Sequence, residues 1–269
     1  MKKILMLGDI NSPHIQKWVS GVASLGYETA VFSMSNPFID WYSSFGIRLL
    51  NNQNKIDNKM FSETDLSKLR YFKFSRSLKR VIKSFKPDII HAHYATSYGM
   101  LGALSKVHPF FLSVWGSDVF DFPGRSVFHR YFLKWIFRRS DLILSTSLVM
   151  KQEILRYTNK EVEVTPFGID TNKFFNFRKR DSDIFTIGII KTLESHYGID
   201  YLIRAFGIIK KKYPDKKIRL MIVGQGTRMS EYVKLVSELD LSESVLFTGR
   251  ISQEEVPSMH NMIDVFVCP

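Results

Sequence analysis

The chain has 269 residues, of which 45% are hydrophobic and 24% charged, and Lys and Arg exceed Asp and Glu by 38 − 26 = 12. These proportions are those of a folded globular protein, and they exclude a collagen-like fibre and a disordered tail. The single cysteine, Cys268, excludes a disulfide-stapled secreted mini-protein and favours a reducing cytosol, and no apolar run reaches the roughly 18 residues that would cross a bilayer.

Short apolar runs alternate with amphipathic helical patterns over the first 170 residues. The expected strands are 3–7, 28–32, 88–92, 110–114, 141–145 and 162–164. The expected helices are 15–25, 66–85, 97–106, 126–139 and 148–157. Such alternation is typical of a parallel sheet with crossover helices, so the predicted fold class is α/β.

A second alternation follows a basic, asparagine-containing connector that ends near Asp183. Its expected strands are 184–190, 218–223, 245–247 and 264–268. Its expected helices are 199–212, 228–239 and a short one whose start is marked by the capping-box spacing of 252–255. The sequence therefore predicts two α/β domains, 1–170 and 183–269. The second is expected to be incomplete, because the chain ends inside a strand, and one face of its sheet is expected to be bare.

The positive charge is concentrated in the first 170 residues, which hold 23 Lys and Arg against 14 Asp and Glu. Eight of these cations fall in segment 66–87, which has no acidic residue, and a second aromatic and basic stretch covers 128–139. One interpretation is two amphipathic helices with solvated basic faces. The other adds attraction to an anionic membrane surface, worth about 1 kcal/mol per basic residue. No nucleic-acid-binding signature is present, so a membrane is favoured over nucleic acid.

Signatures of hydrolases, zinc enzymes and dinucleotide-binding proteins are missing or partial. There is no Gly-x-Ser-x-Gly, His-Glu-x-x-His or paired-cysteine spacing. His91 and His93 lie on one side of a strand without an evident third ligand, which favours a structural pair over a metal site. Segment 224–229 supplies only two of the three glycines of a nicotinamide loop, but a backbone loop of this kind is suited to phosphate.

Polar residues follow the strands where ligands of open parallel sheets bind. Those of the first domain offer side chains that bind hydroxyl groups: Asn11, Ser12, His14, His93, Trp115 and Asp118. Those of the second domain offer cations and backbone N–H groups: Lys191, His196, Gly224, Gly226, Arg228 and Arg250. This division fits a polyol acceptor and a diphosphate donor. Side-chain cations can stabilise a departing nucleoside diphosphate without a metal.

The order of several segments resembles the family-four retaining glycosyltransferases, which have two Rossmann-like domains (the GT-B fold). These segments are 8–14, 87–94, 113–118, 140–141, 166–170, 197–203, 222–226 and 247–249. The resemblance implies transfer of a sugar, with retained configuration, from a nucleotide sugar to a saccharide or lipid-linked acceptor. It further implies bacterial surface polysaccharide synthesis at the inner, cytoplasmic face of the membrane, with no metal required.

The resemblance also implies residue roles. The second-domain residues Lys191, His196, Gly224, Gly226, Arg228 and Arg250 would bind the donor. His14, His93 and Asp118 would act at the reacting sugar, beside an acceptor-side loop containing Asn11, Ser12 and Trp115. The sequence departs from the family where Ser12-Pro13-His14 replaces a glycine pair and where Trp115 replaces a frequent histidine. Two glutamates that line the family's donor sugar site would fall beyond Pro269.

Structural roles remain as alternatives for these residues. Asp118 would then cap a helix, Lys191 would be a solvated cation, and Gly224 and Gly226 would only permit a turn. Two alternative functions also stay open. The first is a non-catalytic glycan- or lipid-binding or partner subunit derived from such an enzyme, and the second is a nicotinamide-dependent oxidoreductase.

Overall fold

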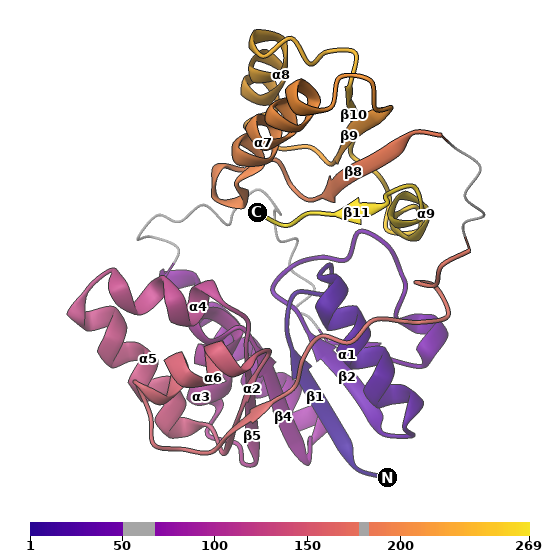
Figure 1. Ribbon diagram of the computed structural model, residues 1–269. Helices are drawn as coiled ribbons and strands as arrows, with labels where there is room; N and C mark the ends of the chain where they lie inside the picture. Colours follow the sequence, from indigo (N-terminus) through magenta and orange to yellow (C-terminus); the bar gives the residue numbers. More distant parts are fainter. Residues whose placement is uncertain (51–67, 178–182) are drawn as a thin grey trace. The chain divides into compact units, whose positions relative to one another are not determined.

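The structure, a computed structural model, describes residues 1–50, 68–177 and 183–269 (Figure 1). It divides into two compact units, Met1–Gly168 and Ile169–Pro269. Each unit is built around its own parallel sheet, so the predicted α/β class is confirmed. Parts of two predicted segments, 66–67 of the basic stretch and 178–182 of the connector, lie outside the described residues. Within the described residues, none of the helices is both long enough and apolar enough to span a bilayer.

The first unit contains a seven-stranded parallel sheet in the order β3-β2-β1-β4-β5-β6-β7. Its strands are β1 (Lys3–Leu7), β2 (Glu28–Phe32), β3 (Arg48–Leu49), β4 (Ile89–His93), β5 (Phe110–Val114), β6 (Leu142–Ser145) and β7 (Val162–Val164). The chain runs outward from β1 to β3 and then returns to place β4 on the other side of β1. This reversal creates a switch point at the carboxyl ends of β1 and β4, where α/β proteins bind ligands.

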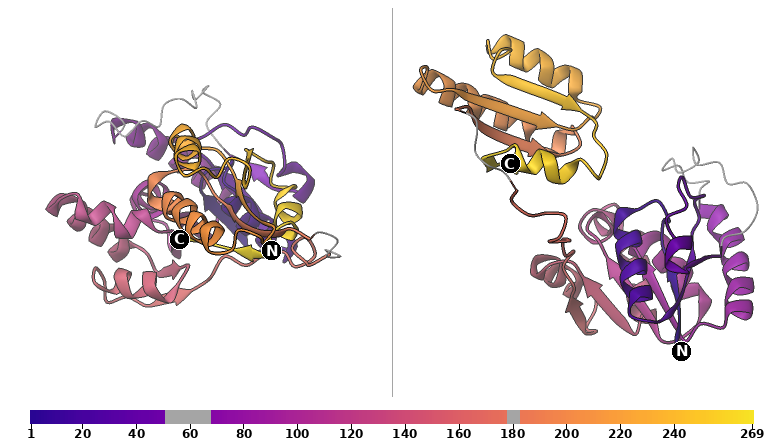
Figure 2. Two further views of the ribbon diagram at one scale, coloured as in Figure 1. Left: turned by 45° about the horizontal axis from the view of Figure 1, so that its top comes forward. Right: turned by 90° about the vertical axis from the view of Figure 1, so that its right-hand side faces the viewer.

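Helices cover both faces of this sheet (Figure 2). They are α1 (Pro13–Ser24), α2 (Lys68–Phe85), α3 (Met100–Ser105), α4 (Ser117–Phe120), α5 (Val127–Arg139) and α6 (Leu148–Leu155). The side chains of β1 show how the sequence allows helices to pack on both faces of the sheet. Leu5 and Leu7 join the large core that also holds residues of α2, α3 and α5, whereas Ile4 and Met6 join the core that contains α1 residues. Alternate side chains thus serve opposite layers, as a fully covered parallel sheet requires.

Two short elements of the first unit were not predicted, and one helix begins earlier than expected. Strand β3 has two residues and α4 has four, too few for a periodic pattern. Helix α1 begins at Pro13 rather than Ile15, because proline suits the first turn of a helix.

The second unit contains a four-stranded parallel sheet in the order β10-β9-β8-β11. Its elements are β8 (Phe185–Ile190), α7 (Ile199–Lys212), β9 (Ile218–Val223), α8 (Met229–Glu238), β10 (Val245–Gly249), α9 (Val256–Asn261) and β11 (Val265–Phe266). Helices α7 and α8 lie on one face and α9 on the other (Figure 2). The core of this unit joins Ile189 and Ile222 of the sheet to apolar residues of α7 and α8.

The face turned away from α7 and α8 differs from the expected bare surface. Met221 and Val223 are completely buried there, at the centre of the sheet. Leu246 and Phe266, in the strands at the two margins, are 42% and 44% exposed. The prediction of an uncovered face was therefore wrong at the centre, where the α9 segment packs: a Cβ on Gly188 would come within 2.6 Å of the Ile263 side chain.

Candidate functional site

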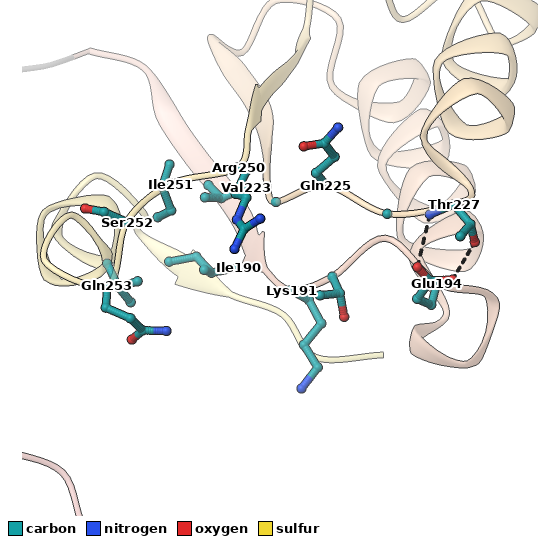
Figure 3. Close-up of a pocket in the computed structure, with 14 residues that line it drawn as sticks. Ile190, Lys191, Glu194, Val223, Gln225, Thr227, Arg250, Ile251, Ser252 and Gln253 are labelled. Carbon is teal, nitrogen blue, oxygen red and sulfur yellow. Dashed lines mark hydrogen bonds between the residues drawn. The ribbon is translucent and has the colours of Figure 1, made fainter. Parts of the chain in front are cut away.

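A pocket of about 860 Å³ lies at the carboxyl ends of β8, β9 and β10 in the second unit (Figure 3). Residues of three segments line it, those that follow each strand: 190–194, 223–227 and 250–256. Four of the six donor-site residues expected from the sequence are among them, namely Lys191, Gly224, Gly226 and Arg250. The pocket therefore lies at the carboxyl ends of parallel strands, where ligands of such sheets bind.

Two glycines allow the loops after β8 and β9 to pack backbone against backbone. The amide of Lys191 donates to the Val223 carbonyl at 2.9 Å, and the amide of Arg228 donates to the Leu193 carbonyl at 3.0 Å. A Cβ on Gly224 would lie 2.0 Å from the Lys191 carbonyl oxygen, and one on Gly226 would lie 2.4 Å from the Leu193 carbonyl oxygen. No other residue type fits at either position without moving backbone.

Two cationic side chains, Lys191 and Arg250, border the pocket. Within the described residues, neither Lys191 nor Arg250 forms an ion pair. Both side chains extend to one side of the glycine loop in Figure 3, whereas Gln225 extends to the other. Cationic side chains without a carboxylate partner, beside a glycine loop that follows a strand, form an electrostatic environment suited to a phosphate or another anion.

Glu194 is a pocket residue that no sequence motif singles out. Its carboxylate accepts hydrogen bonds from the Thr227 amide at 3.0 Å and from the Thr227 hydroxyl at 2.5 Å. These two bonds lower the pKa of Glu194 below its usual value. The carboxylate therefore ties the loop after β8 to the loop after β9. The two partners are 33 residues apart, so no local spacing signals the pair.

The other two expected donor-site residues, His196 and Arg228, do not line the pocket. Arg228 forms an ion pair with Glu231 at 2.7 Å, one turn along α8. The His196 ring is exposed and rests on the Tyr197 ring, with 4.0 Å between centroids. Arg228 and His196 therefore have partners within the unit and lie outside the pocket lining, and their contact with a donor stays a prediction.

In the first unit, rings gather at the carboxyl ends of the strands. His14 stacks on Phe167 with 4.0 Å between centroids, and Trp115 meets both rings edge-on, at 5.4 Å and 5.9 Å. Partial burial lowers the pKa of His14, and the nearby positive charge of Lys17 lowers it further to a smaller extent. The Lys17 ammonium also donates to the Gly168 carbonyl, which helps hold the segment after β7 against α1. His14, Trp115 and Phe167 thus form one ring surface, which we call the aromatic platform.

His91 and His93 lie beneath this platform, against Trp18 of α1. Both are buried, and this burial lowers the pKa of His91 to about 3 and that of His93 well below its usual value. His91 Nε2 lies 2.8 Å from the Ser113 hydroxyl. Neither ring nitrogen of His93 has a hydrogen-bond partner in the described residues, and the same holds for the indole nitrogen of Trp115. No group of three side chains able to hold a metal occurs in the described residues.

The structure gives Asp118 and the acceptor-side loop different contacts from those expected. Asp118 is completely buried, and its carboxylate accepts hydrogen bonds from the amides of Ala95, Trp115 and Gly116 at 2.8, 3.1 and 2.8 Å. Burial raises the pKa of Asp118, although these bonds oppose the rise. This carboxylate anchors the loop that carries Trp115, and it has no surface with which to contact a sugar.

Of the two polar residues in the acceptor-side loop, the Asn11 side chain has structural contacts. The Asn11 amide group donates to the Asn36 carbonyl at 2.8 Å, and its oxygen accepts from the Phe38 amide at 2.8 Å. Ser12 is the residue that precedes α1, and its side chain makes no capping hydrogen bond. Asn11 therefore fixes the loop after β2.

Sequence comparison places the chain in a known family. Residues 3–147 match the family described as "Glycosyl transferase 4-like", and residues 170–269 match "Glycosyl transferases group 1". Because the first match alone covers more than half of the chain, the chain belongs to this glycosyltransferase family. The resemblance and the GT-B type of fold are thereby confirmed.

Curated relatives match parts of the chain. The GDP-mannose-dependent alpha-(1-6)-phosphatidylinositol monomannoside mannosyltransferase of Mycolicibacterium smegmatis is 33% identical over 117 residues, 40% of this chain and 30% of that protein. The alpha-monoglucosyldiacylglycerol synthase of Streptococcus pneumoniae is 24% identical over 223 residues, 73% of this chain and 49% of that protein. The chain thus spans between about a third and a half of these relatives.

A solved structure shares the fold over the whole chain. Sucrose-phosphate synthase from Thermosynechococcus elongatus superimposes with a TM-score of 0.78 and 16% identity, over 100% of this chain and 75% of that one. At this identity the likeness shows the fold alone.

Proposed function

We propose that the chain is a retaining glycosyltransferase whose second unit binds the nucleoside diphosphate of a nucleotide-sugar donor. The observation that carries this proposal is the pocket of Figure 3, where Lys191 and Arg250, which have no carboxylate partner among the described residues, lie beside the loop held by Gly224 and Gly226. Charge develops on the departing diphosphate, and fixed cations stabilise it without a metal. The aromatic platform of the first unit would bind the acceptor.

Removing either pocket cation is expected to weaken binding of nucleoside diphosphates. Hydrogen bonds to charged groups contribute about 1.5–3 kcal/mol, so Lys191→Met or Arg250→Met should reduce the affinity roughly 10- to 100-fold. Calorimetric titration with UDP, GDP and ADP measures this directly. Lys211→Met, which removes an exposed cation from α7 outside the pocket, serves as the control and should bind like the unchanged chain. Equal affinity of all three variants would refute the proposed anion site.

The names of the relatives favour a lipid-linked acceptor. The mycobacterial mannosyltransferase is named for phosphatidylinositol monomannoside, and the streptococcal synthase is named for monoglucosyldiacylglycerol. Both compounds join a sugar to a lipid. We propose a saccharide or lipid-linked acceptor of bacterial surface polysaccharide synthesis for this chain, and attachment of the first unit to the cytoplasmic face of an anionic membrane.

Two basic helices support the membrane proposal. Helices α2 and α5 both pack against α3, so they lie in one layer on the same face of the sheet. Exposed cations on these helices include Arg76, Lys79, Arg80 and Lys83 of α2 and Arg130, Lys134 and Arg138 of α5, and neither helix contains an acidic residue. Phe128 and Tyr131 of α5 are 85% and 67% exposed beside these cations. Cations around exposed aromatic rings suit an anionic lipid surface.

Charge reversal on α5 is expected to release the chain from anionic vesicles. At about 1 kcal/mol per charge, Arg130→Glu with Lys134→Glu should weaken binding by more than tenfold. Sedimentation with vesicles of phosphatidylglycerol and phosphatidylcholine measures this, and pure phosphatidylcholine vesicles provide the uncharged reference. The control variant, Lys211→Glu with Lys212→Glu, changes charge equally on the exposed end of α7 in the second unit. Equal loss in the two variants would mean that net charge, rather than this layer, governs attachment.

A further inference from the structure

Lys191 has an aromatic neighbour that can orient its charge. Its ammonium lies over the face of the Tyr197 ring, 4.4 Å from the centroid. This is well within the roughly 6 Å over which the ring quadrupole attracts a cation. Because no ion pair holds Lys191 in the described residues, the Tyr197 ring is the interaction that restricts the ammonium there.

The backbone that carries the Tyr197 ring is fixed on both sides, and the ring packs partly against the core. Tyr197 ends a short 3-10 turn, Ser195–Tyr197, whose first hydrogen bond runs from the Tyr197 amide to the Glu194 carbonyl at 3.2 Å. Glu194 is fixed in turn by two hydrogen bonds from Thr227. On the other side, Gly198 adopts a left-handed conformation, with φ of 63°, and starts α7. Tyr197 also packs partly against the core of the unit.

A fixed ring matters because lysine carries a compact charge on a flexible four-carbon stem. Without a partner, the ammonium samples many positions, and binding an anion must then bear the entropy of restricting it. A ring that restricts it beforehand lowers this cost. The Tyr197 hydroxyl makes no hydrogen bond within the described residues, so the ring face is the part that acts on Lys191.

We infer that Tyr197 is a positioning residue, which holds the Lys191 ammonium where it meets the diphosphate of the donor. This inference rests on the proposed function, because it takes the pocket as the diphosphate site. It adds a residue outside the pocket lining that sets the affinity of the site through a cation–π contact. Loss of the contact is expected to weaken diphosphate binding about three- to tenfold, the range of such interactions at partly exposed sites.

The test is a double-mutant cycle on the full chain, with UDP, GDP and ADP titrated by calorimetry. Tyr197→Leu should weaken binding three- to tenfold, and Tyr197→Phe should bind like the unchanged chain because it keeps the ring. In a Lys191→Met background, Tyr197→Leu should have no further effect. A second Lys–Tyr pair supplies the matched control: Lys212 lies 5.5 Å from the Tyr213 ring, away from the pocket, and Tyr213→Leu should leave affinity unchanged.

Fluorinated phenylalanines at position 197 separate positioning from packing. Each added fluorine weakens the negative face of the ring while the shape changes little, so affinity should fall stepwise with fluorination. This series also tests the cation–π contact if the Tyr197→Leu variant does not fold. An equal loss for Tyr197→Leu with and without Lys191, or a flat fluorine series, would overturn the inference. If Lys191→Met itself binds normally, the proposed diphosphate site fails instead, so the two failures are distinguishable.

Discussion

Gly224→Ala is expected to destabilise the second unit by about 3 kcal/mol and to abolish binding of nucleoside diphosphates. Overpacking costs about 1–3 kcal/mol, and a positive φ at a residue with a side chain adds about 1–3 kcal/mol. Gly224 has φ of 136°, and a Cβ there would lie 2.0 Å from the Lys191 carbonyl oxygen. That oxygen belongs to backbone, so relief requires the loop that carries Lys191 to move away.

Alanine at three further glycines of the same unit separates the effect of the close contact from the effect of the positive φ. Gly226→Ala introduces only a close contact, 2.4 Å from the Leu193 carbonyl oxygen. Gly249→Ala introduces only a positive φ of 73°, because no atom of the described residues lies within 4 Å of its Cβ. Gly207→Ala in α7 meets only ordinary contacts at 3.4 Å, so it should be neutral or up to about 1 kcal/mol stabilising. The expected order of destabilisation places Gly224 first and Gly207 last.

Amide hydrogen exchange of β8 and β9 in the full chain measures this order, and calorimetry with UDP, GDP and ADP measures the pocket. All four tryptophans, Trp18, Trp41, Trp115 and Trp135, lie in the first unit, so tryptophan fluorescence reports whether that unit stays intact. Unchanged exchange and affinity in Gly224→Ala would show that the two loops are not packed as described.

The sequence predicted the framework well because strands and helices leave periodic patterns. The expected strands 3–7, 110–114 and 218–223 and the helix 199–212 match β1, β5, β9 and α7 residue for residue. The same reasoning brought Lys191, Gly224 and Arg250 to one pocket, since each follows a parallel strand. The end of a strand is a position that sequence can define.

The direction of a side chain beyond the strand end is set by turn geometry, which sequence defines poorly. Arg228 follows the glycine loop, yet it turns outward to Glu231. Asp118 follows β5, yet it turns inward to three backbone amides. Glu194 and Thr227 meet only after two loops have packed, and no local pattern marks such a pair.

Acidification is expected to destabilise the first unit from about pH 6.5 downward. In the unfolded chain a histidine has a pKa near 6.5, whereas in the folded unit the pKa of His91 is about 3 and burial holds the pKa of His93 well below its usual value. Below pH 6.5 the unfolded state therefore binds more protons than the folded state, and the stability of the first unit decreases as the pH is lowered. For His91 alone the loss is about 2 kcal/mol at pH 5. His93 and His14 act in the same sense, and Asp118, with its raised pKa, acts in the opposite one.

Because several groups titrate together, the informative quantity is the difference between the unchanged chain and His93→Leu. Leucine is close to histidine in volume, and it removes two buried ring nitrogens that have no hydrogen-bond partner in the part of the chain that the structure describes, so stability near pH 7 should be kept or increased. Urea unfolding followed by tryptophan fluorescence between pH 7 and pH 4.5 should show a shallower pH dependence for this variant. His196→Leu, on the surface of the second unit, should leave that dependence unchanged. Parallel pH profiles for His93→Leu and the unchanged chain would mean that His93 gains a proton in the folded unit, which its complete enclosure by Trp18, His91 and Trp115 opposes.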